Sequence, residues 1–353
     1  MKQLSFLCSA LVLAVGCGTD PPAEVESTAA QVVVPEGATL KKVFTRSLPI
    51  QGGLTEGPAA APDGSIYFSD IPFGSDKGKI MRFDPSTGET AVFAEDSGKA
   101  NGLTFEAEGH LLGAEGANEG GRQISRWNIE SGEKTTVTDN YDGQRFNAPN
   151  DLVLDSNGRI YFSDPRYLGA EERELEHMAV YRVDTDGTVV ELTHEVEKPN
   201  GVALSPDGRT LYVADHNNGR ENIADPDAPV GEPGAMKIYS FPLGEDGLVS
   251  GPRKTLVDFG KEAGCDGMTV DERGNVYLTS RSLKRPGVMI INPDSEEVGF
   301  IPTGPENQTD ALNAKGLPSN VEFGVGDEAS VLYVTIDLSL YRIPLGVKGY
   351  RPY

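Results

Sequence analysis

Short hydrophobic runs alternate with short polar segments along this chain. We find no long stretch with apolar residues at helical spacing. The apolar runs are rich in β-branched residues and are separated by clusters of glycine, proline, asparagine and aspartate. Residues 202–204 form one such run, 205–208 a Ser-Pro-Asp-Gly turn, and 211–214 a second run. This pattern predicts a β-hairpin, and its recurrence predicts an all-β protein with little helix.

Six copies of the hairpin pattern follow one another along the chain. Each copy is a polar residue, an apolar run, a turn and a second apolar run, as in EGPAAAPDGSIYFSD and NGVALSPDGRTLYVAD. We call the first polar residues the openers, and they are Glu56, Asn101, Asn150, Asn200, Asp266 and Asn320. The openers are 45 to 66 residues apart, and further strand-like segments lie between copies, at 78–83, 179–183 and 235–239. About four strands per repeat predicts a six-bladed β-propeller, with four-stranded antiparallel blades around a central channel.

Residues 40–353 are expected to form this propeller. The ring must join its ends to avoid an open sheet edge, and either residues 339–343 or the segment near Val43 and Phe44 is expected to close it. The longest interval between openers contains an insertion at 217–233, which is polar and rich in glycine and proline. We expect that insertion to form a rim over one mouth of the channel.

The N-terminal residues 1–17 have the features of an export signal. Lys2 is followed by an apolar run at 4–15, which is too short to span a bilayer, and small residues precede Cys17. The segment resembles a bacterial lipoprotein signal in which Cys17 becomes the lipidated N-terminus. Residues 18–39 are then predicted to form a flexible tether. We therefore expect an exported, lipid-anchored envelope protein, periplasmic or at the cell surface, with plain secretion as the alternative.

Charge and cysteine content narrow the possible partners. The formal net charge is −23, which argues against nucleic acid and against an anionic membrane surface. The acidity either keeps an exported protein soluble or reflects an oxygen-rich cation site. Only Cys8, Cys17 and Cys265 are present, so the chain offers neither an intrachain disulfide framework nor a cysteine-based zinc site. Cys265 is expected to be a buried core residue.

The openers carry the candidate chemistry. If the apolar run after each opener is the innermost strand of a blade, all six openers point toward one end of the channel. Two carboxylates and four amides in one ring suit a hard divalent cation, most naturally Ca²⁺. The openers include no histidine or cysteine, which argues against zinc. For any one opener, such as Asn200 before Gly201, ordinary turn chemistry is the alternative explanation.

Four of these segments carry a resemblance to a known family. The motifs E-G-P at Glu56, P-N-D at Asn150, P-N-G at Asn200 and D-G-M at Asp266 occur in the order seen in the SMP-30/gluconolactonase family. Its members are six-bladed, calcium-binding lactone hydrolases related to the diisopropylfluorophosphatases. The resemblance covers about residues 54–341. It implies that Glu56, Asn150, Asn200 and Asp266 bind the metal and that Asp266 is the base that activates water.

The remaining openers and their neighbours are candidates for substrate binding. Asn101 and Asn320 are expected to face the substrate or to support the metal ligands. Animal members of the family have an arginine two residues before the asparagine of the N-D motif, where this chain has Ala148; Arg145 lies nearby. His216 is a candidate for substrate binding and an alternative base. Asp215 is a further alternative, but the same repeat position holds Asp70 and Asp164, which favours a structural role in a turn.

These residues predict metal-assisted ester hydrolysis of a small-molecule lactone or ester, with Ca²⁺ polarising the carbonyl. A propeller fold alone does not establish catalysis. A non-catalytic binding module in which calcium acts as a structural pin is therefore the alternative. Phosphotriester hydrolysis at the same metal is a narrower one.

Overall fold

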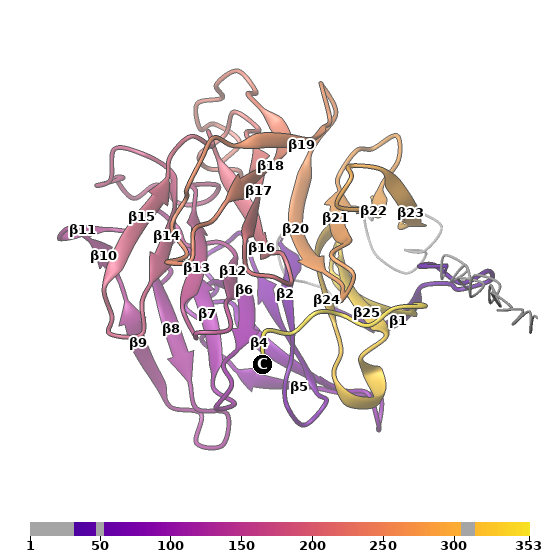
Figure 1. Ribbon diagram of the computed structural model, residues 1–353. Helices are drawn as coiled ribbons and strands as arrows, with labels where there is room; N and C mark the ends of the chain where they lie inside the picture. The colour runs from indigo at the N-terminus through magenta and orange to yellow at the C-terminus, as the bar shows by residue number, and fades with distance from the viewer. Residues whose placement is uncertain (1–31, 47–52, 305–314) are drawn as a thin grey trace, which may run out of the picture. The chain divides into compact units, whose positions relative to one another are not determined.

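A computed structural model describes residues 32–46, 53–304 and 315–353 of the chain. These residues form an all-β, six-bladed propeller with four antiparallel strands in each blade, as the repeat pattern predicted (Figure 1). The innermost strands surround the middle of the molecule, and the fourth strands lie at its outside. Helix is limited in the described residues to one short 3-10 turn, η2 (Gly326–Glu328).

Each blade follows the same strand order from the centre outward. The first two blades are β2 (Leu54–Ala60), β3 (Ile66–Ile71), β4 (Lys79–Asp84) and β5 (Glu89–Ala94), then β6 (Ala100–Phe105), β7 (Leu111–Glu115), β8 (Gln123–Trp127) and β9 (Lys134–Thr138). The third and fourth are β12 (Leu152–Leu154), β13 (Ile160–Asp164), β14 (Ala179–Val183) and β15 (Val189–Thr193), then β16 (Pro199–Leu204), β17 (Thr210–His216), β18 (Met236–Pro242) and β19 (Lys254–Asp258). The fifth is β20 (Cys265–Val270), β21 (Val276–Ser280), β22 (Gly287–Ile291) and β23 (Glu297–Pro302).

The sixth blade joins the two ends of the ring. Its inner strands are β24 (Pro318–Phe323), β25 (Val331–Ile336) and β26 (Ser339–Pro344), and its outer strand is β1 (Lys41–Thr45) from the start of the domain. β1 runs antiparallel to β26, with Lys41 opposite Arg342 and Thr45 opposite Ser339. Both segments that the sequence offered for closure therefore take part, and the pairing removes the free edge that β26 would otherwise present.

Apolar side chains fill the spaces between neighbouring blades. Tyr161 of blade three packs with Val202 and Tyr239 of blade four, and Cys265 packs with Tyr212 and Leu278 between blades four and five. Cys265 is completely buried, and burial raises the pKa of its thiol. It is therefore a core residue, as expected, and its thiol is protonated at neutral pH.

The packed domain begins earlier than Leu40, where we expected it to start. Val33 is buried in the core between the fifth and sixth blades, and Val34 packs against the same cluster. The backbone carbonyl of Val33 also accepts a hydrogen bond of 2.9 Å from the amide of Gly346. The last residues of the expected tether are therefore part of the core. Cys17, the signal segment and the remainder of the tether lie outside the described residues.

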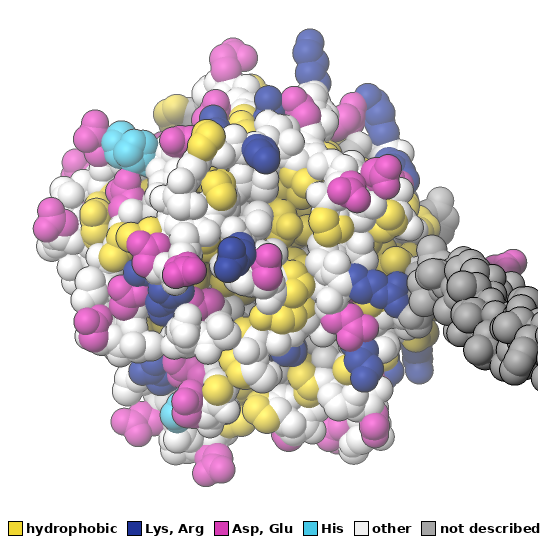
Figure 2. Space-filling model, in the orientation of Figure 1, with side chains coloured by type: hydrophobic (Ala, Val, Ile, Leu, Met, Phe, Trp, Pro, Cys, Tyr) yellow, Lys and Arg dark blue, Asp and Glu magenta, His cyan; other side chains and the backbone are white. Residues whose placement is uncertain are grey.

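A short β-hairpin, β10 (Asn140–Tyr141) with β11 (Gln144–Arg145), lies between the second and third blades. Figure 2 shows acidic side chains scattered over the viewed face, with basic and hydrophobic side chains between them. In the part of the chain that the structure describes, no helix is long and apolar enough to cross a membrane.

Candidate active site

The openers stand at the channel end of the inner strands, as the repeat predicted. Glu56, Asp266, Asn101, Asn150 and Asn200 line one cavity with a volume of ≈ 150 Å³. Four of them lie within β2, β6, β16 and β20, and Asn150 lies two residues before β12. The sixth opener, Asn320, does not line this cavity.

A β-bulge accompanies five of the six openers. The register between the first and second strands shifts at Glu56/Ala59, Ala100/Leu103, Pro199/Val202, Cys265/Met268 and Pro318/Asn320. A bulge places an extra residue in one strand and redirects its side chain. The irregularity accompanies four of the openers that converge, whereas Asn150 reaches the cavity from a blade without a register shift and Asn320 has the shift but does not line the cavity.

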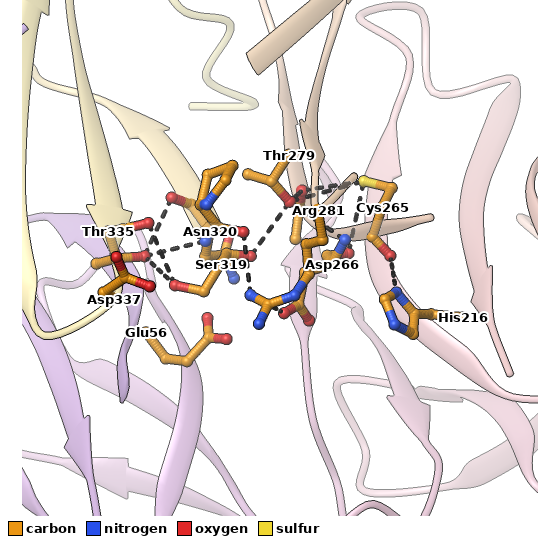
Figure 3. Close-up of polar contacts among 12 residues, drawn as sticks. Glu56, His216, Cys265, Asp266, Thr279, Arg281, Ser319, Asn320, Thr335 and Asp337 are labelled. Atoms are coloured by element: carbon orange, nitrogen blue, oxygen red, sulfur yellow. Dashed lines mark hydrogen bonds and ion pairs between the residues drawn. The ribbon is translucent and has the colours of Figure 1, made fainter. Parts of the chain in front are cut away.

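Hydroxyl groups on the second strands form hydrogen bonds with backbone amides and carbonyls near the bulges. Thr279 Oγ1 accepts a hydrogen bond of 3.2 Å from the Asp266 amide and donates one of 2.8 Å to the carbonyl of Gly267. Thr335 Oγ1 serves Asn320 in the same way, at 3.0 Å from its amide and 3.1 Å from its carbonyl (Figure 3). Buried backbone groups are costly when unpaired, so these hydroxyls stabilise the opener geometry.

A glycine follows four of the openers because the inner strands come very close together. A Cβ added to Gly57 would lie 2.2 Å from the carbonyl oxygen of Asn101, and one added to Gly201 would lie 2.4 Å from that of Asp266. In the third blade the residue after the opener is Asp151 instead. The glycine after these openers is therefore explained by the close approach of neighbouring inner strands.

Two acidic openers face one cationic side chain. Asp266 Oδ2 lies 3.0 Å from Nη1 of Arg281, which also donates to the carbonyl of Pro318 at 3.1 Å. Figure 3 shows the Arg281 guanidinium between the carboxylates of Asp266 and Glu56. Burial raises the pKa of Glu56 well above its ordinary value; Asp266 and Asp151 raise it further, and Arg281 lowers it.

Asp151 places a third carboxylate near the ring. Its oxygens accept hydrogen bonds from the amide of Val202 at 3.2 Å and from Asn320 Nδ2 at 3.5 Å. Burial raises the pKa of Asp151 to about 7, although these hydrogen bonds lower it. Asp151 and Asn320 therefore form a polar layer next to the openers that line the cavity.

His216 reaches the cavity from the end of β17. Its Nδ1 lies 2.9 Å from the carbonyl oxygen of Cys265, which can only accept, so Nδ1 carries the proton and Nε2 is left as an acceptor. Burial lowers the pKa of His216, which favours the neutral ring. A neutral imidazole with a free Nε2 can accept a proton.

Asp215 has the structural role that its repeat position suggested. Its carboxylate accepts hydrogen bonds of 3.0 Å from the amides of Glu197 and Lys198, and its side chain is fully buried. Asp164 accepts hydrogen bonds from two backbone amides of the preceding loop in the same way, both at 2.7 Å. Both acids fix loops between blades, and neither lines the cavity.

Arg145 does not reach the cavity. It lies on the exposed hairpin strand β11, and its Nη2 donates a hydrogen bond of 2.7 Å to the carbonyl of Gly121. Arg145 therefore does not bring a guanidinium group into the cavity in place of the arginine that animal members of the family have at the position of Ala148. Ala148 itself lines the cavity, as do Asn218 and Ile223 from the inserted loop.

The sequence interpretation missed Arg281, although the repeat contained a signal for it. Arg281 directly follows the second strand of its copy, and Ile71, Gly116 and His216 hold the same position in other copies. All four residues line the cavity. Tyr167 and Lys99 also line it, but they come from the connections between repeated segments, where the repeat carries no information.

The donor set fits a hard divalent cation. Glu56 and Asp266 bring two carboxylates to a cavity in which three openers also present amide side chains, and such oxygen donors suit Ca²⁺. In the described ranges, His, Cys, Asp and Glu side chains do not form any group of three or more that could hold a metal ion. Amide oxygens would therefore have to complete the coordination. Burial and the neighbouring Asp266 carboxylate disfavour ionisation of Glu56, and a bound cation would offset this cost.

Fold and site together define the class: a six-bladed propeller with a polar, small-molecule-sized pocket on its axis. The chain matches the SMP-30/Gluconolactonase/LRE-like region over residues 54–336. It is 30% identical to a gluconolactonase of Zymomonas mobilis over 314 residues, which cover 82% of this chain and 78% of that protein. The chain belongs to the SMP-30/gluconolactonase family.

Two further relatives match nearly the whole propeller. A pentonolactonase of Haloferax volcanii is 27% identical over 301 residues, which cover 82% of this chain and 84% of that protein. The solved structure of a gluconolactonase from Xanthomonas campestris is similar with a TM-score of 0.70 and 26% identity, and the match covers 90% of this chain and 93% of that one.

Proposed function

We propose that this protein hydrolyses the ester bond of a lactone in the axial cavity, with a divalent cation, Ca²⁺, bound by Glu56, Asp266, Asn150 and Asn200. The observation that carries the proposal is the convergence of five openers, His216 and Arg281 in one cavity. The similarity to a gluconolactonase and a pentonolactonase supports the reaction type. The ligand set is our prediction from the motifs and the donor chemistry.

Hydrolysis requires a bond from a water oxygen to the lactone carbonyl carbon, cleavage of the ring C–O bond, and transfer of a proton to the ring oxygen. The bound cation would polarise the carbonyl and stabilise the negative charge that develops on its oxygen. Asp266 is the proposed acceptor of the water proton, and Arg281 orients its carboxylate through the 3.0 Å ion pair. His216 Nε2 is the alternative acceptor, because the Cys265 carbonyl fixes its tautomer.

A chelator experiment tests the proposal. Lactone hydrolysis should fall to background after EDTA treatment and dialysis, and it should return when Ca²⁺ is added. A thermal shift with Ca²⁺ but no turnover of any lactone or ester would instead favour the non-catalytic binding module. Including a phosphotriester in the same panel tests the third alternative.

The pH profile of kcat/KM distinguishes the two candidate bases. If His216 is the base, His216→Gln should abolish most activity and remove an acid limb that lies below the ordinary histidine pKa, since burial lowers the pKa of this residue. If Asp266 is the base, His216→Gln should retain most activity and the pH profile of the wild-type protein.

We also propose that the protein is exported and anchored through a lipid on Cys17. The basis is the sequence of residues 1–17 alone. Metabolic labelling with a radioactive fatty acid should label the wild-type protein and fail to label Cys17→Ser. Equal labelling of both proteins, or none of either, would contradict the anchor.

A further inference from the structure

The cavity has two chemically different parts. Its floor is the polar ring of openers, while the wall above is apolar. The wall residues are Ile71 at the end of β3, Ala148 before β12, and Phe73, Ala117, Leu168 and Ile223 from connections between the second and third strands, the last in the inserted loop. A ligand in this cavity therefore meets oxygen-rich chemistry on one side and hydrocarbon on the other.

The Phe73 side of the wall is held in place by a buried lysine. Lys99 Nζ donates to the carbonyls on either side of Phe73, at 3.3 Å to Pro72 and 2.5 Å to Gly74. Asn118 Nδ2 donates to the carbonyl of Phe73 itself at 3.1 Å. Lys99 lines the cavity, and two of its three ammonium N–H groups are directed at the Pro72 and Gly74 carbonyls, so it supports the apolar wall.

Polar groups on the opposite side are also engaged within the protein. The Tyr167 hydroxyl donates to the carbonyl of His216 at 2.9 Å, and Asn218 Oδ1 accepts from Lys198 Nζ at 3.0 Å. The amide of Ile223 donates to the carbonyl of Tyr167 at 2.8 Å, which fixes the inserted loop over the cavity. This side therefore presents an aromatic ring and an aliphatic side chain, and the Tyr167 hydroxyl proton and Asn218 Oδ1 are already used in hydrogen bonds within the protein.

From this arrangement we infer that the preferred substrate is a lactone whose ring carries an apolar alkyl or aryl substituent, in preference to a polyhydroxylated sugar lactone. The inference rests on the proposed lactonase function and specifies its substrate class. The ester group needs only the polar floor. Hydroxyls directed at the wall would lose their water without gaining a partner, whereas an alkyl chain there buries apolar surface.

Three δ-lactones of the same ring size test the inference: D-glucono-δ-lactone, δ-valerolactone and δ-nonalactone, which bears a butyl chain. We expect kcat/KM for δ-nonalactone to exceed both other values by at least about tenfold, in line with the discrimination of a hydrophobic pocket. A kcat/KM for gluconolactone equal to or above that for δ-nonalactone overturns the inference while leaving the lactonase function intact.

A wall variant and a matched control connect the preference to this cavity. Ile223→Ser should lower the ratio of kcat/KM for δ-nonalactone over δ-valerolactone by about tenfold. Val230→Ser changes a residue of the same inserted loop that is 56% exposed and does not line the cavity, so it should leave the ratio unchanged. Equal ratios in wild-type, Ile223→Ser and Val230→Ser proteins would contradict the assignment of the wall.

Binding of stable lactams separates failure of the inference from failure of the function. If no lactone is hydrolysed, the lactonase proposal fails, and the dissociation constants of 6-butyl-2-piperidone and 2-piperidone then decide the inference. Binding of the butyl lactam at least about tenfold tighter supports an apolar ligand class. Equal or weaker binding of the butyl lactam overturns it.

Discussion

Thr279 shows how a single hydroxyl supports an axial carboxylate. It is completely buried, and its Oγ1 pairs with the Asp266 amide and the Gly267 carbonyl at the bulge. The opener was visible in the sequence because it recurs at one repeat position. Its support was harder to see, because serine, threonine and alanine all occur at the supporting position, as Ser69, Ala214 and Thr279 show.

Thr279→Val should therefore destabilise the protein and reduce activity together. The nearly isosteric change leaves the Asp266 amide unpaired and the Gly267 carbonyl with only the Cys265 thiol as donor, at 3.3 Å, which should lower the free energy of unfolding by about 1–3 kcal/mol. Urea unfolding and kcat/KM provide the measurements. Thr279→Ser keeps the hydroxyl and is the control; an equal loss in both variants would show that the hydroxyl is not what matters.

Asp164 should make stability depend on pH. Burial raises its pKa to about 7, whereas an aspartate in the unfolded chain has a pKa of about 4. Between these values the folded protein retains a proton that the unfolded chain releases. This contribution to stability is fully present below about pH 4 and is lost as the pH rises toward 7.

The free energy of unfolding of wild-type protein, relative to Asp164→Asn, should thus fall by roughly 1 kcal/mol per pH unit over that window. Urea unfolding at pH 5, 6 and 7 measures the difference. The exposed Asp294→Asn variant is a control that should show no such trend. A difference between wild type and Asp164→Asn that stays constant across pH would contradict the assignment.

At the scale of the element, the inner strands meet too closely for a side chain after most openers. In the sequence, this close approach is reflected in the glycine that follows the opener in the E-G, N-G and D-G pairs. Ordinary turn chemistry also explains such pairs. The structure distinguishes the two explanations, because the Cβ position of Gly201 is occupied by the next strand. The short strands and hairpins were predictable from their alternation and turns, since such signals are local.

Gly201→Ala should accordingly force β16 and β20 apart. The added methyl group would lie 2.4 Å from the Asp266 carbonyl oxygen and 2.9 Å from Gly267 Cα, so we expect a loss of about 1–3 kcal/mol in unfolding free energy. Gly74→Ala is the control, because nothing lies within 4 Å of its Cβ position. Similar stability of the two variants in urea would refute the close approach of the strands.

At the scale of the whole molecule, the repeat count fixed the number of blades, and the need for closure suggested how the ends meet. The details of the cavity wall could not be predicted in this way. Phe73, Leu168 and Ile223 belong to loops that differ between copies, and their convergence depends on the closed ring. The sequence also misplaced the domain start, because a short apolar segment around Val33 looks like a tether until a partner surface is known.

Removal of residues 1–46 should open the ring. Without β1, the edge of β26 is unpaired, and we expect dimers or aggregates in size-exclusion chromatography. Phe44→Ala is the matched control: it removes the ring contact with Phe68, at 5.2 Å between centroids, but retains the strand. This variant should be less stable yet monomeric. A truncated protein that remains monomeric and as stable as wild type would show that β1 does not close the propeller.

The central claim is that the axial ring of openers is the site of lactone hydrolysis, and Asp266 tests it most directly. The measurement is kcat/KM for lactone hydrolysis by wild-type, Asp266→Asn and Asp294→Asn proteins at saturating Ca²⁺, with the melting temperature of each recorded. Asp266→Asn should lose at least about a hundredfold in kcat/KM while remaining folded, and Asp294→Asn should match wild type. Folded Asp266→Asn protein with activity within a few-fold of wild type would contradict the account.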